Sequence, residues 1–532
     1  MIGRLNEAMV GTATTLAARF QTCFSPQLHF MQHLSEQELQ RRKNLDALRQ
    51  RGIEPYPAAL YPVNAFAHPT KENFSDEGEK KQVVLAGRLM SFRGKGKATF
   101  CELQDSSGRV QLYVNQDEIC PGEDKSFYTD VFLHLLDLGD FIGVKGEVFR
   151  TKVGEISIKV KELTLLAKSL KPLPVVKVDA EGQAHDVVTD PEFRYRQRYA
   201  DLVVNPHVRE TFVKRTRMMN SIRTYLNEHG ALEVDTPVLQ PIPGGAAARP
   251  FTTHHNALDI PLYLRIANEL YLKRLIVGGF DWVYEFSRNF RNEGMDRTHN
   301  PEFTVLEFYV AYKDYFWMME TTEQMLERVA IETTGGTELK VGDQSISMKA
   351  PFARISICEA IKQHTGHDVA GMNEEQLRGV CRQLSIHTDN TMGRGKLIDE
   401  IFGEKCEHHY VQPTFIMDHP VEMSPLTKKH RTEAGLVERF ELMINGKEMA
   451  NAYTELNDPI DQRERFEDQV KLQERGDHEA MYIDHDFLRA LEYGMPPTSG
   501  IGFGIDRLAM LLTGEASIQD VLLFPQMRLE KE

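Results

Sequence analysis

The sequence predicts an α+β protein in which an amino-terminal β-barrel precedes a larger mixed domain with a helical insertion. Three observations support this prediction. The chain has 532 residues, more than one hydrophobic core usually serves, so two or three domains are expected. Residues 83–173 alternate apolar and polar side chains with period two, as half-buried strands do. Beyond residue 190 strand and helix patterns mix, and residues 353–412 are mostly helical.

The composition indicates a cytoplasmic protein with no membrane partner. Apolar residues make up 41% of the chain and charged residues 27%, as in ordinary globular proteins. No apolar run approaches the length of about 18 residues that a membrane-spanning helix needs. The six cysteines include no C-x-x-C pair, which favours reduced thiols over disulfides or zinc. The net charge of −15 repels phosphate, so a nucleic-acid site must be a local basic surface.

The first element predicted is a helix that follows a variable tail over residues 1–34. We interpret this tail as a poorly ordered segment, or one preceding a true start at Met31, rather than as a transit peptide. Ser35 and Glu38 form a capping box, and the helix is expected to end near Gln50, before Gly52. This helix region spans residues 35–66. Its basic residues predict either a solvated face or an RNA contact, and they are Arg41, Arg42, Lys43 and Arg49.

Residues 67–175 are expected to form the barrel. Five short alternating runs separated by turn residues are typical of an OB-type barrel, a fold that binds single-stranded nucleic acid by stacking bases on aromatic rings. Three aromatic residues, Phe92, Phe100 and Tyr113, accompany four cations, and these are Arg88, Arg93, Lys95 and Lys97. Pro172, Pro174 and the polar residues after them indicate a linker over residues 176–190, so the second domain covers residues 191–530.

The segment from Phe290 to Tyr309 carries the densest group of chemically useful residues. It follows a strand, loop, strand pattern, and no P-loop or G-x-G-x-x-G motif supplies another ATP site. Arg291 can fork onto a phosphate or carboxylate, and Phe303 can stack on a purine. On residue types alone, a solvated hairpin loop explains the segment equally well.

Three motifs resolve this choice by resemblance. Residues 290–303 resemble motif 2 of the class II aminoacyl-tRNA synthetases, residues 500–514 resemble motif 3, and residues 226–251 resemble motif 1. The family's order and spacing are kept. The resemblance implies a catalytic domain built on an antiparallel sheet, with Arg291 and Arg507 as catalytic residues. Pro237 lies where the family has its dimer-interface proline, which implies a homodimer.

The substrate is predicted from charge. An amino-terminal OB-type barrel narrows the resemblance to the lysine, aspartate and asparagine enzymes. A lysine pocket must neutralise an ammonium group, because burying an unpaired charge is prohibitive. Strand alternation directs Glu307 and Tyr309 to one side, and likewise Asn451, Tyr453 and Glu455. Two glutamates and a tyrosine hydroxyl suit an ammonium better than a carboxylate.

The chain resembles the lysyl-tRNA synthetases from about Glu36 to Met527, and this likeness implies roles for individual residues. The lysine-site positions would be Gly245, Glu269, Arg291, Glu307, Tyr309, Asn451, Tyr453 and Glu455, with Glu269 on the α-amine and Arg291 on the carboxylate. Because relatives can have phenylalanine at Tyr453, its hydroxyl contact is the least secure. The ATP-site positions would be Arg291, Glu293, His299, Asn300, Phe303, Glu441, Glu448, Gly504 and Arg507. Glu441 and Glu448 would also hold Mg²⁺, up to about three ions with ATP, and Arg93, Phe100 and Gln111 would read the anticodon.

The function expected from this likeness is that of a lysine–tRNA ligase with ATP, L-lysine and tRNA(Lys) as partners. Three alternatives stay open at this point. One is an aspartyl or asparaginyl enzyme of the same group, which Glu307 and Glu455 oppose. Another is a relative that ligates lysine to a protein, although such relatives lack the barrel. The third is a non-catalytic OB-type RNA-binding protein, which the intact Arg291, Arg507, Glu441 and Glu448 oppose.

Overall fold

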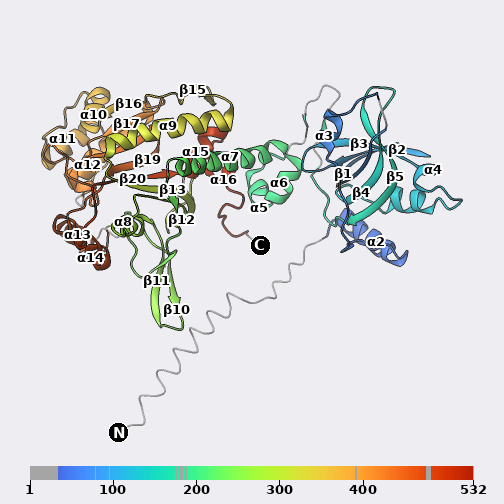
Figure 1. The fold of residues 1–532 in the computed structure, drawn as a ribbon, viewed down its shortest axis with the longest axis horizontal. Coiled ribbons are helices and arrows are strands. Elements are labelled where there is room, and N and C mark those ends of the chain that lie inside the picture. The colour runs from blue at the N-terminus through green and yellow to red at the C-terminus, as the bar shows by residue number, and fades with distance from the viewer. Residues whose placement is uncertain are drawn as a thin grey trace, which may run out of the picture. The chain divides into compact units, whose positions relative to one another are not determined.

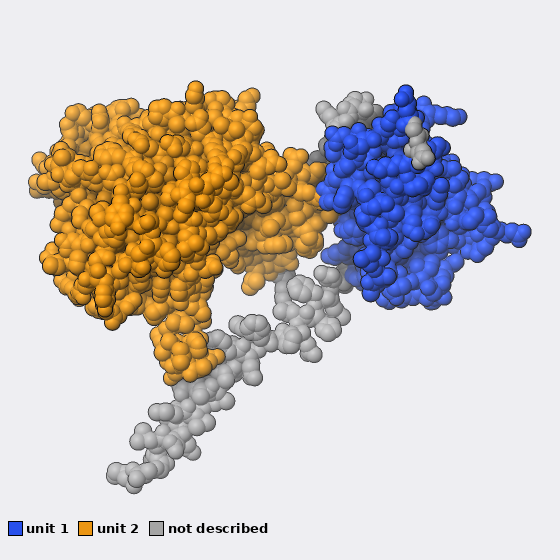
Figure 2. Space-filling view, viewed as in Figure 1, with its two compact units in different colours: residues 1–175 blue, residues 176–532 orange. Residues whose placement is uncertain are grey.

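A computed structural model describes residues 34–77, 80–94, 96–174, 177–178, 184–185, 188–389, 392–474 and 481–530. The chain divides into two compact units, residues 1–175 and residues 176–532, coloured blue and orange in Figure 2. Nearly all of the predicted tail, Met31 included, and most of the predicted linker lie outside the described residues.

The first unit begins with the predicted helix, α2 (Glu36–Gln50). Its capping box is present, since Ser35 Oγ accepts from the Glu38 N–H and Glu38 Oε2 accepts from the Ser35 N–H. Arg41 contributes neither to a solvated face nor to an RNA contact, the two predictions for this basic helix, because it is buried. Its guanidinium donates to the carbonyl oxygens of Leu138, Ser169 and Lys171 at 2.7–3.1 Å. Arg41 therefore joins the helix to the barrel instead of facing solvent or RNA.

The barrel confirms the OB-type prediction. Five strands close in the order β1-β2-β3-β5-β4. The neighbouring pairs are antiparallel except β3 and β5, which run parallel. Inward-facing aliphatic residues fill the interior, among them Leu85, Leu112 and Val144. The strands are β1 (Gln82–Arg93), β2 (Ala98–Gln104), β3 (Arg109–Asn115), β4 (Phe141–Arg150) and β5 (Ile156–Ala167), and the accompanying helices are α3 (Ala67–Glu72), α4 (Gln116–Ile119) and η2 (Phe127–Phe132).

The second unit is built on an eight-stranded, mostly antiparallel sheet, as the resemblance implies. Its strand order is β16-β17-β18-β19-β20-β13-β12-β8. The strands are β8 (Leu232–Glu233), β12 (Trp282–Phe290), β13 (Glu302–Ala311), β16 (Ala353–Ser356), β17 (Thr414–Met417), β18 (Arg439–Ile444), β19 (Lys447–Thr454) and β20 (Thr498–Gly504). Three helices supply the largest core with the sheet, and they are α7 (Pro206–Glu228), α9 (Tyr315–Thr334) and α15 (Ile505–Thr513), as Figure 1 shows.

The helical region lies between two neighbouring strands of this sheet. β16 and β17 pair in parallel, so residues 353–356 belong to the sheet and helices begin at Ile357. These helices share a separate core that includes Leu377, Ile398 and Ile401. They are α10 (Ile357–Thr365), α11 (Glu374–Gln383) and α12 (Arg394–Lys405).

The remaining elements of the second unit surround the sheet. A three-stranded sheet has the order β10-β11-β9, and its β10–β11 hairpin projects from the body of this unit in Figure 1. The remaining strands are β6 (Lys177–Val178), β7 (Ala184–His185), β9 (Leu239–Gln240), β10 (Thr252–His255), β11 (Ile260–Leu264), β14 (Glu338–Val341) and β15 (Gln344–Ser347). The remaining helices are α5 (Pro191–Arg196), α6 (Arg198–Val204), α8 (Glu269–Val277), η3 (Glu407–His409), η4 (Val421–Met423), α13 (Pro459–Glu474), α14 (His485–Glu492) and α16 (Ile518–Val521). Among the helices of the described residues, none has the length and apolar character needed to cross a bilayer.

Candidate active site

A cavity of about 890 Å³ opens on the face of the main sheet formed by β13, β19 and β20. Most residues predicted for lysine or ATP lie on its wall. These are Gly245, Glu269, Arg291, Glu293, His299, Asn300, Phe303, Glu307, Tyr309, Glu448, Asn451, Tyr453, Gly504 and Arg507. Two predicted residues do not: Glu441 lines a neighbouring cavity, and Glu455 lies behind the wall.

The middle strand of the three carries glycine in the cavity wall, at Gly500. Tyr309, Gly500 and Tyr453 are register neighbours across β13, β20 and β19. Side chains two residues apart on a strand share a face. A Cβ atom at Gly500 would meet Glu455 Oε1 at 2.2 Å and Tyr309 Cε1 at 2.3 Å, so no other residue fits there without displacing both. The Tyr309 ring and the Glu455 carboxylate therefore pack directly over the backbone of Gly500.

Arg291 begins the loop between β12 and β13, where the strand, loop, strand prediction is confirmed. The Arg291 N–H donates to the Pro301 carbonyl at 2.9 Å, which closes the loop. The Arg291 guanidinium lies 5.1 Å from the centre of the Phe303 ring, and its buried Nε atom has no hydrogen-bond partner among the residues that the structure describes. Burial lowers the pKa of Arg291. A buried cation with a free N–H is suited to bind a carboxylate or phosphate.

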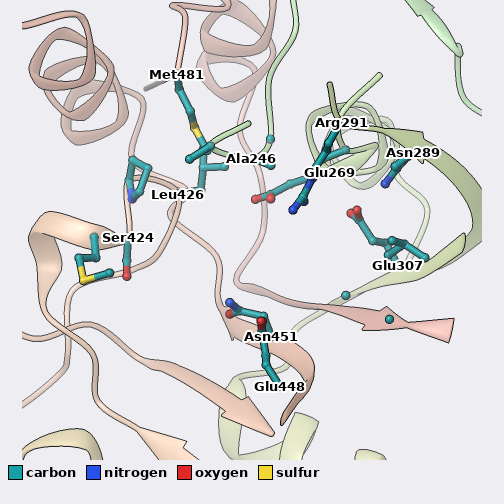
Figure 3. A pocket seen from close by; sticks show the side chains of 18 of the residues that line it. Ala246, Glu269, Asn289, Arg291, Glu307, Ser424, Leu426, Glu448, Asn451 and Met481 are labelled. Atoms are coloured by element: carbon teal, nitrogen blue, oxygen red, sulfur yellow. The ribbon is translucent and has the colours of Figure 1, made fainter. Parts of the chain in front are cut away.

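Buried carboxylates from different elements gather around the cavity. Figure 3 shows Glu269 and Glu307 near Arg291, with Asn451 facing them. The Tyr309 hydroxyl donates to Glu307 at 3.0 Å, and the Tyr453 hydroxyl donates to Glu269 at 2.6 Å. The contact of the Tyr453 hydroxyl with lysine was the least secure part of the prediction. In the structure this hydroxyl is hydrogen-bonded to a side chain of the protein, that of Glu269. Burial, with a contribution from the charge of Glu269, raises the pKa of Glu307 to about 8.

Lys273 is the residue of this site that the sequence analysis missed. Its ammonium forms ion pairs with Glu269, at 2.6 Å, and with Glu455. The side chains of Lys273 and Glu455 are both fully buried. The available sequence signal was the four-residue spacing of Glu269 and Lys273 on one helix. Nothing local indicated that Glu455, far along the chain, would be the second partner.

The opposite end of the cavity carries cations and carboxylates that suit a nucleotide. Arg507, on α15, donates to the Glu448 carbonyl at 2.8 Å and lies 3.2 Å from His299 Nε2. The other ring nitrogen of His299 lies 2.8 Å from Asp296. Asn300 is partly engaged already, because its amide donates to the Glu302 carbonyl at 2.6 Å. Arg507 and Arg291 thus provide two positive groups on one wall, where phosphates could bind.

Glu441 and Glu448 border a second cavity of about 450 Å³. Glu441 accepts from Arg439 at 2.5 Å, and burial raises the pKa of Glu441. Mg²⁺ is commonly held by one or two carboxylates together with substrate phosphates, and this pair of carboxylates fits that requirement. No group of three or more His, Cys, Asp or Glu side chains suited to a metal occurs in the part of the chain that the structure describes. A cation here would therefore need oxygen ligands from the nucleotide.

The barrel carries the predicted anticodon residues on its outer surface. Phe100 and Tyr113 are register neighbours on β2 and β3, with ring centres 5.1 Å apart, and Phe149 on β4 extends the aromatic surface. Gln111 lies two residues from Tyr113 on the same face, and Arg93 pairs with Phe100 in register. Phe92 instead packs on Phe132 towards the core, and Arg88 is turned to the Gly139 carbonyl. Lys95 lies outside the described residues.

Comparisons with known proteins agree with this geometry. Residues 190–528 match the family model for class II tRNA synthetases (D, K and N), and residues 83–166 match the model for an OB-fold nucleic acid binding domain. A lysine–tRNA ligase of Porphyromonas gingivalis is 67% identical over 500 residues, covering 94% of this chain and 86% of that protein. One from Christiangramia forsetii is 64% identical and covers 95% and 88%. One from Azobacteroides pseudotrichonymphae is 64% identical and covers 94% and 99%.

Proposed function

We infer from the family to which it belongs, the class II tRNA synthetases of the aspartate, lysine and asparagine group, that this chain is a lysine–tRNA ligase. It activates L-lysine with ATP, which yields lysyl-adenylate and pyrophosphate, and then transfers lysine to the 3′-terminal adenosine of tRNA(Lys). The observation that carries the substrate assignment is the group of buried carboxylates, Glu269, Glu307 and Glu455, at one end of the cavity. An aspartate or asparagine side chain would find no cation among them to bind, because Lys273 is already paired twice.

We propose the following roles for the lysine-site residues. The carboxylate of the substrate pairs with Arg291, and its α-ammonium group with Glu269, which lies beside Gly245. Gly245 has a φ of +86°, and a Cβ there would lie 3.0 Å from Ala267 and 3.2 Å from the side chain of Glu269. A larger residue would thus narrow this end of the pocket. The side-chain ammonium extends towards Glu307, Tyr309 and Glu455, and Asn451 and Tyr453 complete the wall.

In the activation step the substrate carboxylate attacks the α-phosphorus of ATP, and the bond to pyrophosphate breaks. This nucleophile is already ionised at neutral pH, so no protein base is required. Catalysis is then positioning and charge stabilisation. Arg291 contacts both the attacking carboxylate and the α-phosphate, and Arg507 stabilises the departing pyrophosphate. Phe303 stacks on the adenine ring, with Glu293, His299, Asn300 and Gly504 around the nucleotide.

Mg²⁺, bound with ATP, would neutralise charge that develops on the phosphates. Glu441 and Glu448 would hold it from the protein side. In the unliganded protein Arg439 donates to Glu441, and Arg507 lies 3.5 Å from a Glu448 oxygen. We propose that these arginines keep the two carboxylates apart and oriented until the cation binds.

We further propose that the barrel binds the anticodon. Phe100 would stack on a base, while Arg93 and Gln111 donate or accept hydrogen bonds at its edge. Gln111 already accepts from Ser157 at 2.9 Å, which fixes its amide and leaves its NH₂ group for a base. Uridine-rich anticodons would be preferred.

A homodimer in the cytoplasm is the state in which we expect the enzyme to act. Apolar side chains near the motif 1 residues support an interface, because Leu232, Val238 and Leu239 are each at least 40% exposed. Sedimentation equilibrium checks the assembly: a mass near twice the 60.9 kDa of the chain is expected. A mass of one chain at micromolar concentration would contradict it.

The decisive experiment for the activity is ATP–pyrophosphate exchange with each of the twenty amino acids. Exchange is expected with lysine and not with aspartate or asparagine. Exchange with aspartate alone would overturn the substrate assignment. Exchange with none of them, in a protein that still binds RNA, would favour a non-catalytic RNA-binding protein.

A further inference from the structure

We propose that Lys273 is a positioning and specificity-determining residue, an internal ammonium that holds one oxygen of Glu455 and leaves the other for the side-chain ammonium of the substrate. This inference rests on the proposed activation of lysine. Lys273 acts through its partners, because its ammonium is already paired with Glu269 and Glu455.

The position of Lys273 is set from three elements. It lies on α8, one turn after Glu269, and its Nζ is 5.4 Å from the centre of the Tyr453 ring and 5.9 Å from that of Phe487. Burial acts to lower the pKa of Lys273, but the charges of Glu269 and Glu455 outweigh it, so the pKa stands above its ordinary value. The ammonium is therefore charged and fixed at neutral pH.

The two oxygens of Glu455 have different surroundings. Oε2 forms the ion pair with Lys273. Both oxygens are buried, and neither has a hydrogen-bond partner among the described residues, so Oε1 lacks even the ion pair formed by Oε2. Oε1 lies 2.2 Å from the place where a Cβ at Gly500 would stand, and Gly500 lines the cavity. An unpaired carboxylate oxygen that is buried beside a residue of the cavity wall is costly unless a donor reaches it. A lysine ammonium supplies that donor.

Lys273 also connects the two ends of the lysine site. The second carboxylate paired with Lys273 is that of Glu269. It accepts a hydrogen bond from the Tyr453 hydroxyl, and it is the group proposed to bind the α-amine of the substrate. The ionisable groups facing Lys273 are thus Glu269, Glu455 and Tyr453, with Glu307 and Tyr309 next to them. Burial raises the pKa of Glu455 and Lys273 opposes that shift. Without the ammonium, Glu455 would take up a proton, and a neutral carboxyl binds an ammonium weakly.

A purely structural ion pair is the competing explanation. Removal of such a pair would weaken the fold and would affect lysine and ATP alike. The proposed role instead affects lysine selectively and depends on pH. These consequences separate the two explanations.

The test compares Lys273→Met and Lys273→Gln with Lys168→Met in ATP–pyrophosphate exchange. Lys168 is a matched control, because it is also fully buried and paired with two carboxylates, Asp137 and Asp140, but lies in the first unit. In the Lys273 variants the KM for lysine should rise at least about thirtyfold, as for loss of a buried charge pair. The KM for ATP should stay within about threefold in all variants.

The pH profile adds a readout that a structural defect would not produce. As the pH rises above neutrality, the ratio of lysine KM, variant over wild type, should fall, because Glu455 ionises and regains its charge. Lysine-induced thermal stabilisation should be lost in the variants while ATP-induced stabilisation persists. Lys273→Arg keeps the positive charge but places it on a longer, planar guanidinium group. Its lysine KM should therefore lie between those of the wild type and Lys273→Met, at least about fivefold above the wild-type value.

An unchanged lysine KM in the neutral variants, or an equal rise for lysine and ATP at every pH, would overturn the proposal. If neither neutral variant folds, Lys273→Arg decides in the same way: a selective rise in lysine KM supports the role, and an unchanged value rejects it. If the wild-type protein shows no ATP–pyrophosphate exchange with lysine, the proposed function is overturned instead. Failure of the proposed function and failure of the role of Lys273 are therefore distinguishable.

Discussion

At the residue scale, the ionisation of Glu307 should control lysine affinity. Its pKa is raised to about 8, mainly because of burial. A bound ammonium favours the carboxylate, so below pH 8 lysine binding must release a proton from Glu307. The KM for lysine should therefore fall as the pH rises from 6.5 to 8.5, by up to about tenfold per unit at the acid end. Exchange kinetics at fixed saturating ATP measure this.

The matched control for the pH effect is Glu307→Gln, which has no proton to release. Its lysine KM should be higher and should lose this pH dependence. A Gln variant with the wild-type pH profile would show that another group is responsible.

Gly500 should tolerate no side chain. In Gly500→Ala the added methyl would collide with Glu455 Oε1 and Tyr309, both of which form the lysine site. We expect the lysine KM to rise at least tenfold and the stability to fall by about 1–3 kcal/mol, as for overpacked cores. Gly336→Ala is the control, since no atom lies within 4 Å of its Cβ position. Equal behaviour of the two variants would contradict this account of the pocket.

Residue identity at the site was predictable where neighbours on one strand share a face. Glu307 with Tyr309, and Asn451 with Tyr453, follow from strand alternation alone, and both pairs line the cavity. Lys273 could not be predicted in its role, because its second partner comes from a distant segment through tertiary packing. Alternation also predicted Glu455 for the lysine site, but β19 ends at Thr454, and Glu455 does not line the cavity.

At the element scale, α2 shows what local sequence determines. The capping box is formed within four residues, so the helix start could be predicted from Ser35 and Glu38. The role of Arg41 could not, since its acceptors lie in segments more than ninety residues away. Likewise, β16 and β17 are four-residue strands whose pairing across three helices leaves no periodic signal.

Arg41→Met should loosen the attachment of α2 to the barrel. The substitution leaves the carbonyl oxygens of Leu138, Ser169 and Lys171 without this donor, at a cost of about 2–4 kcal/mol to that unit. Hydrogen exchange of the β1–β5 amides should become faster. Trp282 and Trp317, the two tryptophans, both lie in the second unit, so their unfolding transition should not move.

The control for this element is Lys43→Met, because Lys43 is exposed on the same helix. In the Lys43→Met protein, the backbone amides of the barrel should exchange hydrogen at the wild-type rate. Faster exchange in both variants would mean that helix charge, and not the buried hydrogen bonds of Arg41, holds the helix in place.

At the scale of the whole molecule, the division into two units predicts separable activities. Phe100→Ala removes a stacking ring from the first unit, which should lower kcat/KM for tRNA by roughly 5- to 150-fold, the range of about 1–3 kcal/mol per stacked base. ATP–pyrophosphate exchange, which needs only the second unit, should not change. Aminoacylation with varied tRNA measures the first effect.

Val153→Ala is the matched control for the barrel, since Val153 is 91% exposed in the β4–β5 turn and is not one of the predicted anticodon residues. It should charge tRNA as the wild type does. A Phe100→Ala protein with unchanged tRNA kinetics would contradict the role of this face in binding.

The order of the two folds along the chain was predictable from the change in periodicity, and the comparisons bear it out. The sheet order was not, because β20 inserts between β13 and β19, and each of the three strands comes from a different part of the sequence. That insertion places Gly500 between Tyr309 and Tyr453. Only the resemblance to a known family brought these segments together beforehand.

The closed barrel of the first unit affects how the protein aggregates at high concentration. Each of its five strands is hydrogen-bonded on both sides, so there is no free edge on which another chain could add a strand. Edge-to-edge association is the usual hazard of a β-domain that displays aromatic rings. Here Phe100, Tyr113 and Phe149, all half-buried, lie on strands that are paired on both sides within the barrel.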